Sequence, residues 1–119
     1  MTQNKNVRIL IADDNQDVHE ILTPALEEEG FEVIHAYNGL EVLENISKEV
    51  SLCLLDVMMP EMSGIDACKE IRKTSTLPII MISARGEELD KIIGIELGAD
   101  DYIVKPFSPT ILVHELKQS

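Results

Sequence analysis

The chain has 119 residues, of which 45% are hydrophobic and only 3% aromatic, and its formal charge is −12. This length and composition predict one globular domain, residues 1–119, with a core of aliphatic side chains. Ten basic residues against twenty-two acids argue against nucleic-acid binding by this domain alone, because binding to phosphates needs clustered Lys and Arg. An acidic surface instead favours a basic partner or a divalent cation.

Neither a membrane span nor a targeting segment is visible in the sequence. The longest apolar run is far shorter than a bilayer requires, and the N-terminus lacks the basic start and apolar stretch of a signal peptide. Cys53 and Cys68 form no C-x-x-C pair and have no neighbouring cluster of zinc ligands, so we expect buried thiols. These features predict a cytoplasmic protein.

Five apolar segments alternate with helical patterns along the chain. Three of them are almost continuously apolar, which is typical of strands buried on both faces, and one alternates as an edge strand would. The expected strands are Val7–Ala12, Phe31–Ala36, Ser51–Leu55, Pro78–Ser83 and Tyr102–Val104, of which Phe31–Ala36 is the alternating one.

Each strand is followed by apolar residues at helical spacing. Asn15 or Asp14 can cap the first helix, which contains Pro24 and ends at Gly30. The fourth helix carries Leu89, Ile92, Ile93 and Leu97, and Ser108-Pro109 opens the fifth. Five strands alternating with five helices predict an α/β fold, a flavodoxin-like doubly wound (βα)5 sheet of parallel strands in the order 2-1-3-4-5.

Chemically active side chains are expected at the carboxyl ends of these strands, where open α/β sheets place their sites. Asp13 and Asp14 follow the first strand, Asp56 the third, Ser83 the fourth and Lys105 the fifth. Each alone has an ordinary role as a cap, a turn residue or a solvated charge. Together, three carboxylates favour Mg²⁺, and the added hydroxyl and ammonium suit a phosphoryl group. The combination therefore predicts Mg²⁺-dependent phosphoryl transfer to an aspartate.

Four stretches make a more specific prediction: ILIADDN, LLDVMMPEMSGID, PIIMISA and GADDYIVKPF. They resemble the signature segments of response-regulator receiver domains of two-component systems, and the resemblance covers essentially the whole chain. The sequences of these segments are most similar to those of receivers of the OmpR/PhoB type. The resemblance implies a CheY-like fold and a signalling domain that catalyses only its own phosphorylation and dephosphorylation.

The resemblance also implies a role for each site residue. Asp56 would accept a phosphoryl group from a sensor histidine kinase or a phosphotransfer protein and so switch an output domain or target protein. Asp13, Asp14, Asp56 and the backbone carbonyl of Met58 would bind Mg²⁺. Ser83 and Lys105 would bind phosphoryl oxygens, and Ser83 and Tyr102 would form the conformational switch. A cis Lys105-Pro106 bond is expected as well.

Several positions depart from the family's usual pattern. Met58 and Arg85 flank the phosphoryl site, where fast-hydrolysing relatives often carry an amide or acid, so we expect slow self-hydrolysis. Lys91, Glu96, Asp100 and Asp101 fit the charged face through which OmpR/PhoB-type receivers dimerise. The last helix has Thr110 and Glu115 where arginines are usual, which leaves dimerisation uncertain on this face.

Three alternatives stay open or are disfavoured by the sequence. The sequence leaves open whether this is a receiver excised from a longer regulator or a single-domain regulator, with a single-domain phosphorelay shuttle as the alternative function. An aspartate-nucleophile phosphatase usually needs a second acid at the position of Met58, and a flavin-binding module needs a phosphate loop after the first strand that is missing.

His19, His35 and His114 are expected at surface or edge positions without a catalytic role.

Overall fold

The computed structural model describes residues 7–83, 98–104 and 108–118. Within these ranges the chain forms one five-stranded sheet with the order β2-β1-β3-β4-β5, and every pairing is parallel. The predicted strand order is therefore confirmed. The strands are β1 Arg8–Ala12, β2 Glu32–Ala36, β3 Leu52–Asp56, β4 Ile79–Ser83 and β5 Asp101–Val104. The strands begin and end within one residue of their predicted bounds.

Four helices lie within the described ranges. They are α1 Gln16–Glu28, α2 Gly39–Asn45, α3 Gly64–Arg72 and α5 Pro109–Gln118. The predicted fourth helix lies outside the described residues, and the label α4 stays unused. Side-chain oxygens cap three of these helices by accepting a hydrogen bond from an amide of the first turn. The Asp17 amide donates to Asn15, the Glu41 amide to Asn38 and the Asp66 amide to Ser63.

The end of α1 follows its sequence signals closely. The helix continues through Pro24 and stops before Gly30, whose φ of +93° is a left-handed conformation that glycine adopts at little cost. The Gly30 amide donates to the Glu27 carbonyl oxygen at 3.0 Å. This turn reverses the chain and leads it directly into β2, the edge strand.

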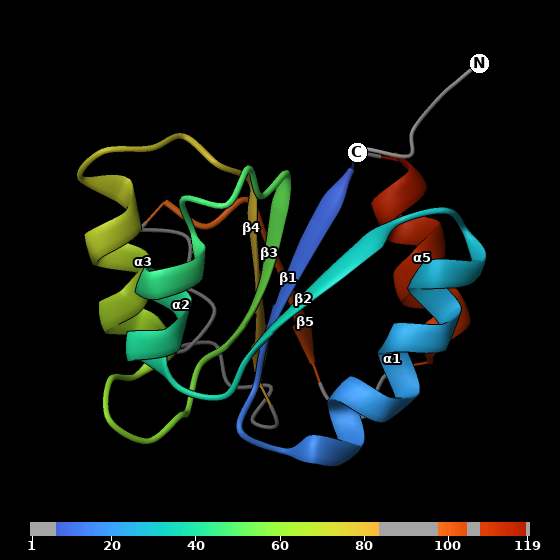
Figure 1. Cartoon of the computed structure of the whole chain (residues 1–119), viewed down its shortest axis with the longest axis horizontal. Helices are drawn as coiled ribbons and strands as arrows, with labels where there is room; N and C mark the ends of the chain where they lie inside the picture. The colour runs from blue at the N-terminus through green and yellow to red at the C-terminus, as the bar shows by residue number, and fades with distance from the viewer. Residues whose placement is uncertain (1–6, 84–97, 105–107, 119) are drawn as a thin grey trace.

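Two apolar layers enclose the sheet, one on each face. Figure 1 shows α2 and α3 covering one face and α1 and α5 covering the other. Because side chains alternate along a strand, Leu10 and Ala12 pack on the α2/α3 side while Ile9 and Ile11 pack on the α1/α5 side. The central strands are thus buried from both sides, as their apolar sequences predict.

The two cysteines are free and buried, as predicted. Burial raises the pKa of the Cys53 thiol to about 12 and also raises the pKa of the Cys68 thiol. Both side chains therefore act as small apolar core residues on the α2/α3 side. No helix in the described part of the chain is long and apolar enough to cross a membrane.

The surface position expected for His19 is wrong. The His19 side chain is only 1% exposed, because His19 lies three and seven residues before Leu22 and Leu26, on the buried face of α1. This spacing is visible in the sequence and could have indicated burial. The other two expectations are confirmed, since His35 and His114 are both exposed.

Replacing Leu54 by alanine should test the central role of β3 in this core. Leu54 is fully buried in the α1/α5 layer, so Leu54→Ala should lower the free energy of unfolding by about 2–5 kcal/mol in urea denaturation. Leu40→Ala is the matched control, because Leu40 is 46% exposed and its loss should change stability by about 0.5 kcal/mol or less. Equal losses for the two variants would show that β3 is not the packed centre.

Candidate functional site

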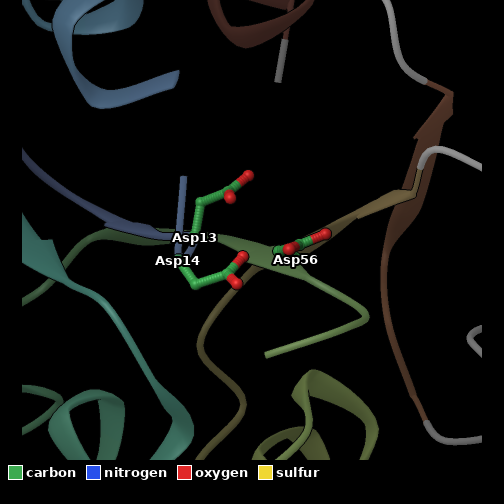
Figure 2. Close-up of side chains that lie close together, drawn as sticks. All are labelled: Asp13, Asp14 and Asp56. Atoms are coloured by element: carbon green, nitrogen blue, oxygen red, sulfur yellow. The ribbon is translucent and has the colours of Figure 1, made fainter. Parts of the chain in front are cut away.

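Three carboxylates meet at the carboxyl edge of the sheet, where the sequence predicts a site. Asp13 and Asp14 follow β1 directly, and Asp56 is the last residue of the neighbouring strand β3. One oxygen from each side chain lies within 4.8 Å of the others. Figure 2 shows the three side chains gathered at the ends of these two strands.

The carboxylates differ in their exposure to water. Asp13 is fully buried and Asp56 is 5% exposed, whereas Asp14 is exposed. Negative charges this close repel one another strongly when little water screens them. A bound cation would offset this repulsion, and a set of oxygen ligands alone suits a hard cation better than zinc. The residues present therefore fit a divalent metal ion with an open side toward solvent at Asp14.

Asp13 is held in place by hydrogen bonds from three directions. Its amide donates to the Ala36 carbonyl oxygen at 3.1 Å, and its Oδ1 accepts from the Asn15 amide at 2.9 Å. Its carbonyl oxygen lies 2.8 Å from His19 Nε2. The two backbone contacts hold Asp13 after β1 and the Asn15 amide orients its carboxylate, which lowers the cost of assembling a metal site.

Asp56 is positioned by the strand and by the loop that follows it. Asp56 pairs with Ile82 of β4, and the next residue, Val57, donates its amide to the Ile82 carbonyl oxygen at 2.9 Å. The Gly64 amide then returns to the Val57 carbonyl oxygen at 2.9 Å. The start of α3 is thereby held against the end of β3.

Gly64 makes this close approach feasible. A Cβ atom at position 64 would overlap the carbonyl oxygen of Asp56, so any larger residue would push α3 away from β3. The glycine is needed because two stretches of backbone touch there, a common reason for glycine beside functional residues.

Of the remaining predicted site residues, three lie within the described ranges and the others outside them. Ser83 ends β4, is 2% exposed, and pairs in register with Val104 of β5, so it lies at the same edge as Asp56. Met58 follows Asp56 by two residues and its side chain is 64% exposed. Tyr102 lies in β5 opposite Met81, while Lys105, Pro106 and Arg85 lie outside the described residues.

A model of the response regulator receiver domain matches residues 9–117 of the chain. The chain belongs to the receiver domain family. The predicted resemblance is confirmed, including its OmpR/PhoB type: DrrB of Thermotoga maritima, described as an OmpR/PhoB homologue, superposes with a TM-score of 0.86 at 29% identity, over 94% of this chain and 51% of that one. A two-component response regulator from Clostridium difficile superposes with a TM-score of 0.90 at 32% identity, over 94% and 93% of the two chains.

The chain is also similar to longer regulatory proteins. It is 47% identical over 110 residues to the transcriptional regulatory protein CpxR homolog of Haemophilus influenzae, a match over 92% of this chain and 48% of that protein. The receiver thus spans about half the length of the curated relatives it matches.

Gly64→Ala should disturb the receiver at the Asp56 backbone. We expect a loss of about 1–3 kcal/mol in the free energy of unfolding, because the added methyl group overlaps backbone atoms that cannot rotate away. Shifts in ¹H–¹⁵N spectra should centre on residues 56–58.

Gly30→Ala is the control for this substitution. It strains a left-handed φ but meets no atom within 4 Å, so it should cost about 1 kcal/mol and leave the Asp56 region unchanged. If Gly64→Ala were as stable as Gly30→Ala, with no shifts at residues 56–58, the close packing of α3 on β3 would be refuted.

Proposed function

We propose that this receiver accepts a phosphoryl group on Asp56 from the phosphohistidine of a sensor histidine kinase, in a reaction that needs Mg²⁺. The observation that carries the proposal is the approach of the Asp56 carboxylate to those of Asp13 and Asp14, within 4.8 Å at the carboxyl edge of the sheet. A nucleophilic carboxylate beside ligands for a divalent cation is the arrangement that aspartyl phosphate formation requires.

Each side chain has a defined task in this reaction. An oxygen of Asp56 attacks phosphorus, the P–N bond of the phosphohistidine breaks, and the imidazole leaves with its electron pair and takes up a proton. Asp13, Asp14 and Asp56, with the carbonyl oxygen of Met58, would hold Mg²⁺. The bound ion supplies positive charge to the phosphoryl oxygens as negative charge develops on them.

The proposed response of the protein runs through β4 and β5. Ser83 ends β4, directly after Ile82, which pairs with Asp56, and its hydroxyl is assigned a hydrogen bond to a phosphoryl oxygen. Lys105 directly follows β5 in the sequence, and we assign its ammonium group to pair with another phosphoryl oxygen. Tyr102 lies on β5 at the level of Met81 and is assigned the second part of the switch, in which phosphorylation shifts a two-state equilibrium.

The downstream partner is proposed from the relatives. The CpxR homolog of Haemophilus influenzae is named a transcriptional regulatory protein, so control of an output domain in transcription is the leading role, in the cytoplasm, and a single-domain phosphorelay shuttle is the second. Catalysis is restricted to the protein's own aspartate. Asp100, expected on a dimer face, is paired within the chain with Arg72 at 3.1 Å, which leaves fewer charges for a partner copy.

Intact mass measurement with acetyl phosphate tests the phosphoacceptor. The native chain should gain one phosphoryl group when Mg²⁺ is present and none when it is chelated, and Asp56→Asn should gain none. Asp66→Asn removes the same charge at the exposed start of α3 and should be phosphorylated like the native chain. A folded native protein that stays unmodified, or an Asp56→Asn variant that gains the mass, would refute the proposal.

Met58 should keep the phosphorylated form long-lived. Met58 follows Asp56 by two residues and is exposed, and its thioether cannot orient water through strong hydrogen bonds. Met58→Asn supplies an amide at that position and should speed decay of the phosphorylated form by roughly tenfold, less than a full general base provides. Met58→Leu is the control and should decay at the native rate. A decay that slows on Met58→Ala, with Met58→Asn unchanged, would contradict this role.

A further inference from the structure

A pair of histidines next to the acidic site has no chemical task in the proposed phosphorylation beyond the contact of His19 with the Asp13 backbone. His19 on α1 and His35 on β2 approach each other through their Nδ1 atoms, which lie 2.8 Å apart. The other nitrogen of His19, Nε2, lies 2.8 Å from the carbonyl oxygen of Asp13. Tyr37 packs on the His19 ring with 4.2 Å between ring centroids.

The protons of this pair can be assigned from the partners. A carbonyl oxygen only accepts hydrogen bonds, so His19 Nε2 must carry a hydrogen. In the neutral ring, His19 Nδ1 is then a bare nitrogen with its lone pair directed at His35. His35 Nδ1 must donate to it, and His35 can move this hydrogen to its own Nε2 by changing tautomer.

The hydrogen bond from His19 Nε2 to the Asp13 carbonyl oxygen leaves Nδ1 of His19 available as a metal ligand. Metal-binding histidines typically donate their second ring N–H to a backbone carbonyl or carboxylate, which fixes the tautomer and the direction of the lone pair. His19 already makes this bond to Asp13 while buried in a rigid helix. Partial loss of water and the nearby His19 lower the pKa of His35, so the neutral ring, which is the form that binds metals, is favoured near pH 7.

The pair is also open to a ligand from solvent. A surface depression of about 350 Å³ lies over it, lined by Gln16, Glu20, Thr23 and Tyr37 besides the two histidines. Glu20 and Gln16 contact each other there at 3.4 Å. Water and these polar side chains are available to complete the shell of an ion that enters from this side.

We propose that His19 and His35 form a second cation site, for a borderline divalent transition metal such as Zn²⁺, bound through the two Nδ1 atoms. Zinc takes histidine nitrogens at about 2.0–2.1 Å, so two of them at tetrahedral angles are about 3.3 Å apart. The present 2.8 Å separation needs to widen by about half an ångström, and the His35 ring must turn so that both nitrogens point at the ion and no longer at each other. The His35 side chain is exposed on the edge strand and can make this movement.

The site is chemically distinct from the acidic cluster, although Asp13 links the two. The carboxylate of Asp13 is part of the oxygen cluster, whereas its backbone carbonyl oxygen accepts a hydrogen bond from His19 Nε2. Imidazole nitrogens select Zn²⁺, Cu²⁺ or Ni²⁺ over Mg²⁺, so the two sites prefer different ions. Both thiols of the chain are buried with raised pKa values, which removes them as competing ligands in the folded protein.

Titration of the full chain with Zn²⁺ in a large excess of Mg²⁺ tests the proposal, followed by calorimetry and by ¹H–¹⁵N spectra. The excess Mg²⁺ occupies the acidic cluster. The native chain should bind one equivalent of Zn²⁺, with shifts centred on residues 19 and 35 and extending to Asp13 and Ala36. His35→Gln should weaken binding by at least about tenfold, and His114→Gln, which changes an exposed histidine on α5, should bind as the native chain does.

Each outcome decides the matter. Native-like Zn²⁺ affinity in His35→Gln, or no binding to the native chain in excess Mg²⁺, would overturn the site and leave the pair as a structural hydrogen bond. His35 is the first position to change because its side chain is exposed, so the fold should persist. His19→Gln is the second variant. If its ¹H–¹⁵N spectrum shows a folded protein, it too must lose Zn²⁺ affinity. None of these results depends on phosphorylation of Asp56.

Discussion

Mutual repulsion among the carboxylates of Asp13, Asp14 and Asp56 is the constraint on which the account of this receiver depends. The three groups lie within 4.8 Å of one another, and two of them are almost fully removed from water. The fold brings them together by placing the ends of β1 and β3 side by side. The free energy of the apolar core offsets this repulsion, and a bound divalent cation would reduce it. The site is thus built by the sheet and completed by its ligands.

The rest of the structure serves to keep these strand ends fixed. β1 and β3 are interior strands with apolar packing on both faces, a setting in which local unfolding costs the most free energy. The Asp13 amide donates to the Ala36 carbonyl oxygen, and Asn15 and His19 contact the Asp13 carboxylate and carbonyl oxygen, so Asp13 is held at three atoms. The contact of Gly64 with the Asp56 carbonyl holds the start of α3. Asp14 and Met58 are exposed and mark the side of the site that faces solvent. An ion, a phosphoryl donor and water can reach the carboxylates from there.

Much of this could be predicted from the sequence, and the reasons differ by residue. Apolar runs such as Leu52–Leu55 fix buried strands, and alternation with helices fixes their order, so Asp13, Asp14 and Asp56 fall at one edge by topology alone. The His19–His35 contact could not be predicted in the same way. It joins α1 to the edge strand β2 across sixteen positions, and depends on the helix rotation that turns His19 inward. The close approach of Gly64 to Asp56 likewise depends on the path of a loop, for which hydrophobic periodicity gives no signal.

The stability of Asp14→Asn with and without Mg²⁺ tests the central claim most directly, because Asp14 is exposed and the substitution keeps its shape. In the absence of divalent ions the variant should be more stable to urea than the native chain, since one of three repelling charges is gone. In Mg²⁺ at a hundredfold excess over its dissociation constant the native chain should gain about 2.7 kcal/mol, and the variant much less, so the order reverses. A variant that is less stable than the native chain in both conditions, with no gain from Mg²⁺ in either protein, would contradict the account.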